Sequence, residues 1–182
     1  MEAFLVSTGL VALAEMGDKT QLLSLVLAAR FRRPWPIVLG IFVATVANHA
    51  LAAAVGGWLA HEIGPYWMRI AIAVGFLAMA AWALVPDKAD DAGVRGGGVF
   101  IATCVAFFLA EMGDKTQLAT VALAARYAAL SAVVLGTTAG MMLANVPVVF
   151  FGERIAARLP LTILRRAAAA AFAALGILAL VT

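Results

Sequence analysis

The sequence predicts an all-α integral membrane protein with six transmembrane helices, arranged as two inverted three-helix repeats. Three observations carry this prediction. The 182-residue chain is 65% hydrophobic and 13% charged, with a mean hydropathy of +1.03. A string of ten residues occurs twice, and basic residues gather in alternate loops. A soluble domain of this size does not need so much apolar surface, whereas each membrane span requires roughly 20 apolar residues.

Six apolar segments lie between groups of helix-breaking residues, and we expect each segment to form one helix across the bilayer. The breakers are prolines, glycines and charged residues within 32–36, 64–65 and 86–98. The sixth segment carries Arg165 and Arg166 in its first turns, and long arginine side chains can reach the membrane surface from there. The six segments are residues 4–29, 37–60, 66–85, 99–125, 130–151 and 161–181.

The two halves of the chain are related by an offset of 96 residues. The string Leu-Ala-Glu-Met-Gly-Asp-Lys-Thr-Gln-Leu occupies residues 13–22 and again 109–118. The sequence Leu-Ala-Ala-Arg likewise ends at Arg30 and at Arg126, and Asn48 lies beside the position that matches Asn145. We therefore predict a first three-helix repeat at 1–86, a polar cytoplasmic linker at 87–98 and a second repeat at 99–182.

Basic residues in the loops predict the orientation. If the N-terminus lies outside the cytoplasm, the two outer loops hold only Arg69 and Arg126. The inner loops then hold nine basic residues: Arg30, Arg32, Arg33, Lys88, Arg95, Arg154, Arg158, Arg165 and Arg166. This bias places both termini outside, in a multi-pass protein of the inner (plasma) membrane. Three spans per half make the repeats antiparallel, and inverted repeats place substrate sites near the bilayer midplane.

The duplicated string puts charges in the middle of two apolar segments. Glu15 and Asp18 are three residues apart, so on a regular helix they share a face, and the same holds for Glu111 and Asp114. Charged side chains at this depth are costly and mark ion pathways. The two copies together contain four carboxylates and two lysines, Lys19 and Lys115, which balance part of the negative charge. The remaining charge of −2 suits one divalent cation.

Neutral oxygens near the four acids could complete a metal site. An all-oxygen shell favours Ca²⁺, Mn²⁺ or Mg²⁺ over zinc or copper. The candidates are Thr20, Thr116, Gln21, Gln117, Asn48 and Asn145. Without a metal, four neighbouring buried carboxylates resist full ionisation, so the site is expected to take up protons. Competition between metal and protons for the same oxygens is the basic requirement of a cation/proton exchanger.

Several residues of the motifs have more than one interpretation. Lys19 and Lys115 could instead form local ion pairs with the glutamates four residues before them. Gly17 and Gly113 could break their helices or allow close helix packing. Met16 and Met112 could offer a soft sulfur ligand, although packing is favoured on a regular helix. His49 could be a ligand, a proton relay or a hydrogen-bonded helix contact.

The string Glu-x-Gly-Asp-Lys-Thr, present twice in a six-span protein, resembles the hallmark of a cation/proton exchanger family with twin E-x-G-D-[KR]-[ST] motifs. That family includes bacterial manganese exporters of the MneA type and Golgi and chloroplast manganese/calcium transporters. The resemblance covers nearly the whole chain. It implies transport of Mn²⁺ or Ca²⁺ by Glu15, Asp18, Glu111 and Asp114. For a chain as short as the bacterial form, it implies Mn²⁺ efflux from the cytoplasm.

Other functional classes are less well supported by the sequence. A Ca²⁺/H⁺ antiporter or a divalent cation channel would use the same acids, whereas a membrane metalloenzyme would need a second polar cluster for its substrate. We therefore expect no catalytic residues and no bound cofactor. The expected partners are a divalent ion, protons and the lipid bilayer, and not nucleic acid. One chain carries both halves of the predicted site, so a monomer could suffice, and a homodimer is left open.

Overall fold

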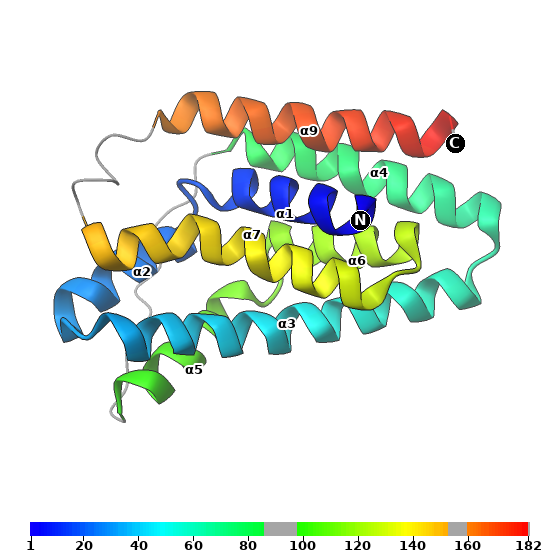
Figure 1. Cartoon of the computed structure of the whole chain (residues 1–182). Helices are drawn as coiled ribbons and strands as arrows, with labels where there is room; N and C mark the ends of the chain where they lie inside the picture. The colour runs from blue at the N-terminus through cyan, green and yellow to red at the C-terminus, as the bar shows by residue number, and fades with distance from the viewer. Residues whose placement is uncertain (86–97, 153–159, 182) are drawn as a thin grey trace.

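The computed structural model describes residues 1–85, 98–152 and 160–181, and this part of the chain is all helical (Figure 1). In these described ranges, four helices are long and apolar enough to cross a membrane: α3 (Pro34–Glu62), α4 (Pro65–Ala83), α7 (Leu130–Phe151) and α9 (Leu161–Val181). Four helices of 13 or 14 residues are too short to cross alone: α1 (Glu2–Glu15), α2 (Lys19–Phe31), α5 (Val99–Glu111) and α6 (Lys115–Tyr127).

The sequence left open whether the helices expected over residues 4–29 and 99–125 are broken at Gly17 and Gly113, and the structure shows a break in each. Each segment is interrupted inside the duplicated string, between α1 and α2 and between α5 and α6. The cause is a glycine with positive φ, +85° at Gly17 and +76° at Gly113. This left-handed backbone conformation is easy for glycine and costly for residues with a Cβ. Of the two roles considered for these glycines, the structure shows the helix break.

The two short helices that follow the breaks also begin and end alike. Asp18 and Asp114 are the N-cap residues of α2 and α6. Each helix closes on a left-handed residue, Arg32 or Ala128, whose backbone N–H donates to the carbonyl four residues before it. The duplication is therefore preserved in local backbone conformation as well as in sequence.

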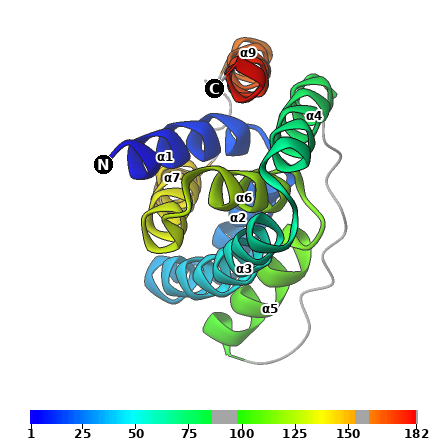
Figure 2. The same ribbon diagram turned by 90° about the vertical axis from the view of Figure 1, so that its right-hand side faces the viewer.

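The largest helix–helix interfaces join the two halves of the chain. Helix α7 packs on α1, α9 on α4, and α3 on α5, α6 and α7 (Figures 1 and 2). Gly136 and Gly140 lie one turn apart on α7. A Cβ at these positions would stand 2.5 Å from the Phe4 carbonyl oxygen and 2.6 Å from that of Thr8. Small residues at this spacing let two helix backbones touch, as in membrane helix pairs.

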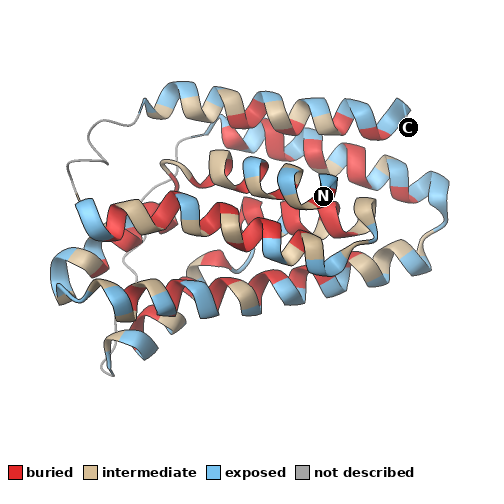
Figure 3. Cartoon of the chain, viewed as in Figure 1, coloured by how far each residue is buried: buried red, intermediate tan, exposed pale blue. Residues whose placement is uncertain are grey.

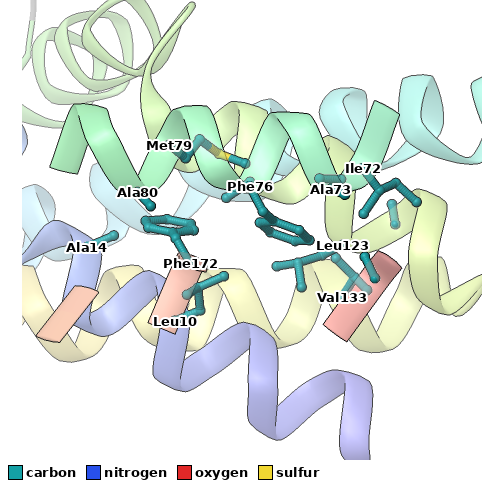
Figure 4. Close-up of a cluster of buried hydrophobic side chains, with 14 of the residues drawn as sticks. Leu10, Ala14, Ile72, Ala73, Phe76, Met79, Ala80, Leu123, Val133 and Phe172 are labelled. Atoms are coloured by element: carbon teal, nitrogen blue, oxygen red, sulfur yellow. The ribbon is translucent and has the colours of Figure 1, made fainter. Parts of the chain in front are cut away.

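Two clusters of buried apolar side chains fill the bundle. The first joins α1, α4, α6 and α9 through residues such as Leu10, Phe76, Leu123 and Phe172 (Figure 4). The second joins α2, α3, α5 and α7, through residues such as Leu27, Ile41, Phe107 and Met141. The outer faces of the helices are exposed (Figure 3) and carry many large apolar side chains. An apolar outer surface is what lipid contact requires.

The chain ends and the short helices define two ends of the bundle. The start of α1 and the end of α9 point toward the same end, where α1 also packs on α6 (Figure 1). Helix α2 packs on α5 at the opposite end. The linker predicted at 87–98, apart from Gly98, lies outside the described residues. So do four residues that support the predicted orientation: Lys88, Arg95, Arg154 and Arg158.

Candidate metal centre

The two helix breaks bring three acidic side chains together inside the bundle. Glu15, Asp18 and Asp114 each offer one carboxylate oxygen, and these oxygens lie within 4.8 Å of one another. The three residues are at most 2% exposed. Two of them come from the first copy of the duplicated string and one from the second. Half-helices that meet at a break inside a membrane protein are a common way to build an ion site.

The fourth predicted acid, Glu111, is equally buried but lies on the side of the cluster next to α3. Its Oε2 is 4.0 Å from Nε2 of His49. Glu111 is also close enough to Glu15 and Asp114 for like-charge repulsion with both. The structure thus gathers all four acids into one region, with three of them in the tightest group.

Each lysine of the duplicated string pairs with the aspartate of the other copy. Nζ of Lys19 lies 3.3 Å from Oδ1 of Asp114, and Lys115 donates a hydrogen bond to Oδ1 of Asp18. The alternative interpretation, local pairs with the glutamates four residues earlier, assumed a continuous helix that the chain does not form. The ion pairs instead tie the two halves together at the centre.

Threonine hydroxyls hold the two glutamates in the same way. Thr20 donates to Oε2 of Glu15, and Thr116 donates to Oε2 of Glu111 at 3.0 Å. The other oxygen of each glutamate, Oε1, is buried and accepts no hydrogen bond from any residue that the structure describes. A buried carboxylate oxygen without a partner is costly. Two such oxygens at the centre of the bundle are chemically suited to bind a cation or to carry a proton.

The two glutamines brace the helix breaks. Oε1 of Gln21 accepts the N–H of Gly17 at 2.9 Å, and Oε1 of Gln117 accepts the N–H of Gly113 at 2.7 Å. Their amide nitrogens reach the other half of the chain: Gln21 donates to the Ala144 carbonyl at 2.9 Å, and Gln117 donates to Oδ1 of Asn48 at 3.0 Å. These contacts hold the breaks in place, and metal binding by the glutamines stays a prediction.

The two asparagines differ in how they are held. Asn145 is bonded at both ends of its amide: Oδ1 accepts from the Ser24 hydroxyl at 2.7 Å, and Nδ2 donates to the Met141 carbonyl at 3.1 Å. Asn48 accepts from Gln117, and its Nδ2 has no hydrogen-bond partner in the described part of the chain. Ser24 was missed in the sequence analysis. The 96-residue offset offered a signal, because it matches Ser24 with another hydroxyl residue, Thr120.

The surroundings of the two breaks are not equivalent. A Cβ on Gly17 would stand 2.6 Å from Cδ2 of Leu161, at the start of α9, whereas a Cβ on Gly113 would meet no atom of the described residues within 4 Å. Met112 is 56% exposed, which does not favour its sulfur as a ligand. The first break is therefore covered by a helix of the second half, and the second break is more open.

Comparison with known proteins gives concordant matches. A family model described as a divalent cation/proton antiporter, GDT1, matches residues 3–91 and 99–182. A protein of Vibrio cholerae serotype O1 named "Putative manganese exporter" is 52% identical over 174 residues, which cover 94% of this chain and 87% of that protein. A "GDT1-like protein" of Synechocystis is 28% identical over 181 residues, covering 87% of each chain. No solved structure matches this chain.

Proposed function

We propose that this chain, which belongs to the GDT1 family of divalent cation/proton antiporters, exports Mn²⁺ from the cytoplasm in exchange for protons. Family membership and the manganese exporter homologue make the chain a membrane transporter of divalent cations and not an enzyme. The choice of Mn²⁺, the export direction and the coupling to protons are the parts that we add. The 52% identity to a protein named as a manganese exporter supports the choice of ion.

The single observation that carries the proposal is the buried carboxylate cluster of Glu15, Asp18 and Asp114, with its oxygens within 4.8 Å of one another. Hard divalent cations are held by carboxylate and neutral oxygens. We propose Glu111 as the fourth acid of the site. Thr20, Thr116, Gln21, Gln117, Asn48 and Asn145 position these acids or add neutral oxygens, and Lys19 and Lys115 balance the charge.

Proton coupling is supported by two glutamate oxygens to which no described residue donates a hydrogen bond, Oε1 of Glu15 and Oε1 of Glu111. A bound metal satisfies these oxygens when the site is loaded. When the metal leaves, protonation of each glutamate removes its negative charge and so lowers the cost of burying the side chain. The carboxylates then carry either metal or protons, which is what an exchanger needs.

The path across the membrane is proposed from the two repeats, residues 1–86 and 99–182. Four long helices and two broken pairs, α1–α2 and α5–α6, would together make six crossings with the site at the breaks. Helices α4 and α9 pack on each other and against α6 and α1 (Figure 2). We propose that movement of this helix pair opens the site alternately to the two sides, with both termini outside the cytoplasm.

Transport by purified protein in liposomes tests the proposal. A liposome interior more acidic than the medium should drive Mn²⁺ accumulation, because protons leaving the liposome are exchanged for the metal. Glu15→Gln and Glu111→Gln should abolish this accumulation. Glu62→Gln is the matched control, because Glu62 is exposed at the end of α3.

Three results would contradict the proposal in different ways. Equal Mn²⁺ flux with and without a proton gradient would indicate a channel. Accumulation of Ca²⁺ in preference to Mn²⁺ would favour the second candidate, a Ca²⁺/H⁺ antiporter, which the oxygen-rich cluster also suits. Full activity of both glutamate variants would exclude the proposed site.

A further inference from the structure

We infer that His49 is a nitrogen ligand of the transported ion and that it sets a preference for Mn²⁺ over Ca²⁺ and Mg²⁺. The inference rests on the proposed function and concerns the same site. His49 lies in the middle of α3 and is fully buried. Within residues 1–85, 98–152 and 160–181, neither of its ring nitrogens has a hydrogen-bond partner. A buried imidazole left without any partner is costly, so its position requires an explanation.

The position of the ring fits a ligand better than a structural contact. Nε2 of His49 lies 4.0 Å from Oε2 of Glu111, which is too long for a hydrogen bond. Metal–donor bonds of about 2.0–2.6 Å place two donors of the same ion roughly 3–5 Å apart. Oε2 accepts from Thr116, whereas Oε1 of Glu111 has no hydrogen-bond partner among the described residues. An ion held between His49 and Glu111 would satisfy both side chains at once.

The second half of the chain provides an internal comparison. The 96-residue offset matches His49 with Asn145, which occupies the corresponding place on α7. Asn145 is bonded at both ends, in part by the Ser24 hydroxyl. The residue that matches Ser24 is Thr120, and its hydroxyl donates to the Thr116 carbonyl. Thr120, the counterpart of Ser24, therefore donates its hydroxyl to the backbone and not to His49. The His49 ring remains available to a ligand.

A nitrogen ligand would change which ions the site prefers. Ca²⁺ and Mg²⁺ take oxygen ligands, whereas first-row transition metals also accept imidazole. In sites with nitrogen and oxygen donors, affinity rises from Mn²⁺ to Fe²⁺ to Co²⁺. Adding one imidazole to a cluster of carboxylates should therefore raise the affinity for Mn²⁺ while leaving Ca²⁺ and Mg²⁺ largely unaffected.

Pulsed electron paramagnetic resonance of Mn²⁺ bound to the purified full-length protein tests the contact directly. A coordinated imidazole gives a nitrogen modulation, and ¹⁵N-labelled histidine changes it in a predictable way. The chain has only two histidines, and the other one, His61, is exposed. We expect the histidine signal in the wild type and in His61→Asn, and its loss in His49→Asn.

Binding measurements test the consequence for selectivity. His49→Asn introduces the residue that the second half has at the matched position. Even residues that only support a ligand change metal affinity by about 10–100-fold when removed, so loss of the ligand should weaken Mn²⁺ binding at least that much. Binding of Ca²⁺ and Mg²⁺ should change several-fold less, and His61→Asn should leave all three unchanged.

The outcomes separate this inference from the proposed function. If wild-type protein binds Mn²⁺ without a histidine nitrogen signal, His49 is not a ligand, although the transport proposal stands. If wild-type protein binds no Mn²⁺, the proposed function fails and the role of His49 falls with it. The labelled wild type decides the contact by itself, so the test holds even if His49→Asn does not fold.

Discussion

Each lysine of the duplicated string pairs with an aspartate from the other half of the chain. Lys115 contacts Asp18, and Lys19 contacts Asp114, so the two copies exchange partners across the centre. The two pairs differ in environment, because the Lys115 side chain is 4% exposed and the Lys19 side chain 21%. The two lysines are therefore expected to contribute differently to the free energy of unfolding, although the two copies of the string are identical.

Replacing each lysine in turn should show how much each of the two ion pairs contributes to stability. Lys115→Met removes a cation from a fully buried pair, and breaking such pairs costs about 3–5 kcal/mol. Lys19→Met should cost less than Lys115→Met, because the Lys19 side chain is 21% exposed and water can partly replace it beside Asp114. Thermal unfolding of the detergent-purified variants measures the difference. Adding Asp18→Asn to Lys115→Met should recover stability, and an equal loss for the two single variants would contradict the structure.

The threonines that hold the glutamates give a second prediction for single residues. Thr20→Val and Thr116→Val remove the hydroxyls that donate to Glu15 and Glu111. Groups that orient a ligand contribute about 10–100-fold to metal affinity, so both variants should bind Mn²⁺ more weakly by that factor. Thr138→Val is the control, because Thr138 is buried and its hydroxyl oxygen has no partner. Wild-type affinity in both Thr20→Val and Thr116→Val would show that the hydroxyls do not support the site.

Among the helices, the two breaks decide where the charged residues lie. The positive φ of Gly17 and Gly113 ends α1 and α5 and starts α2 and α6 in a new direction. The glutamate before each break and the aspartate after it belong to different helices. The helical face that Glu15 and Asp18 were expected to share therefore does not exist, and the break itself brings them together.

Alanine at the two glycines should have unequal effects. Both substitutions force a Cβ into a left-handed conformation, which costs roughly 1–2 kcal/mol. Only Gly17→Ala also drives its Cβ against Leu161, so it should be the more destabilising of the two in thermal unfolding. Leu161→Ala should partly rescue Gly17→Ala and not Gly113→Ala. Rescue of both variants, or of neither, would argue against the contact between α9 and the first break.

In the whole molecule, packing between the halves dominates packing within them. The major interfaces of α1, α3, α4 and α7 are with helices of the other half. The acid cluster and both lysine–aspartate pairs also combine residues from the two halves. Each half by itself would expose apolar faces and leave buried charges without their partners. We therefore expect the two predicted repeats to fold only together.

Expression of the chain in two pieces tests this dependence. Residues 1–92 and 93–182, produced together, should copurify through a tag on one piece and bind Mn²⁺, because packing and ion pairs supply the association. Either piece alone should be degraded or aggregate, and should not bind Mn²⁺. Co-expression with a first piece carrying Glu15→Gln is the control for correct assembly: Glu15 takes no part in the two lysine–aspartate pairs between the halves, so this variant should retain copurification and lose binding. A single piece that binds Mn²⁺ would contradict a site shared between the halves.

The sequence by itself determined the membrane class, the duplication and the residues that form the charged centre. Hydropathy identifies apolar segments because lipid contact demands them, and an exact ten-residue repeat needs no structure to be seen. The same repeat, with its Glu-x-Gly-Asp-Lys-Thr core, was enough to indicate the family that the comparisons show.

Only the tertiary structure decided how those residues meet. Spacing along the chain predicts neighbours on a regular helix, and it fails where a glycine takes a positive φ, as at Gly17 and Gly113. It also contains no information on which lysine faces which aspartate, or on His49 lying beside Glu111. Those contacts join residues about 60 to 100 positions apart, and helix packing alone brings them within a few ångströms.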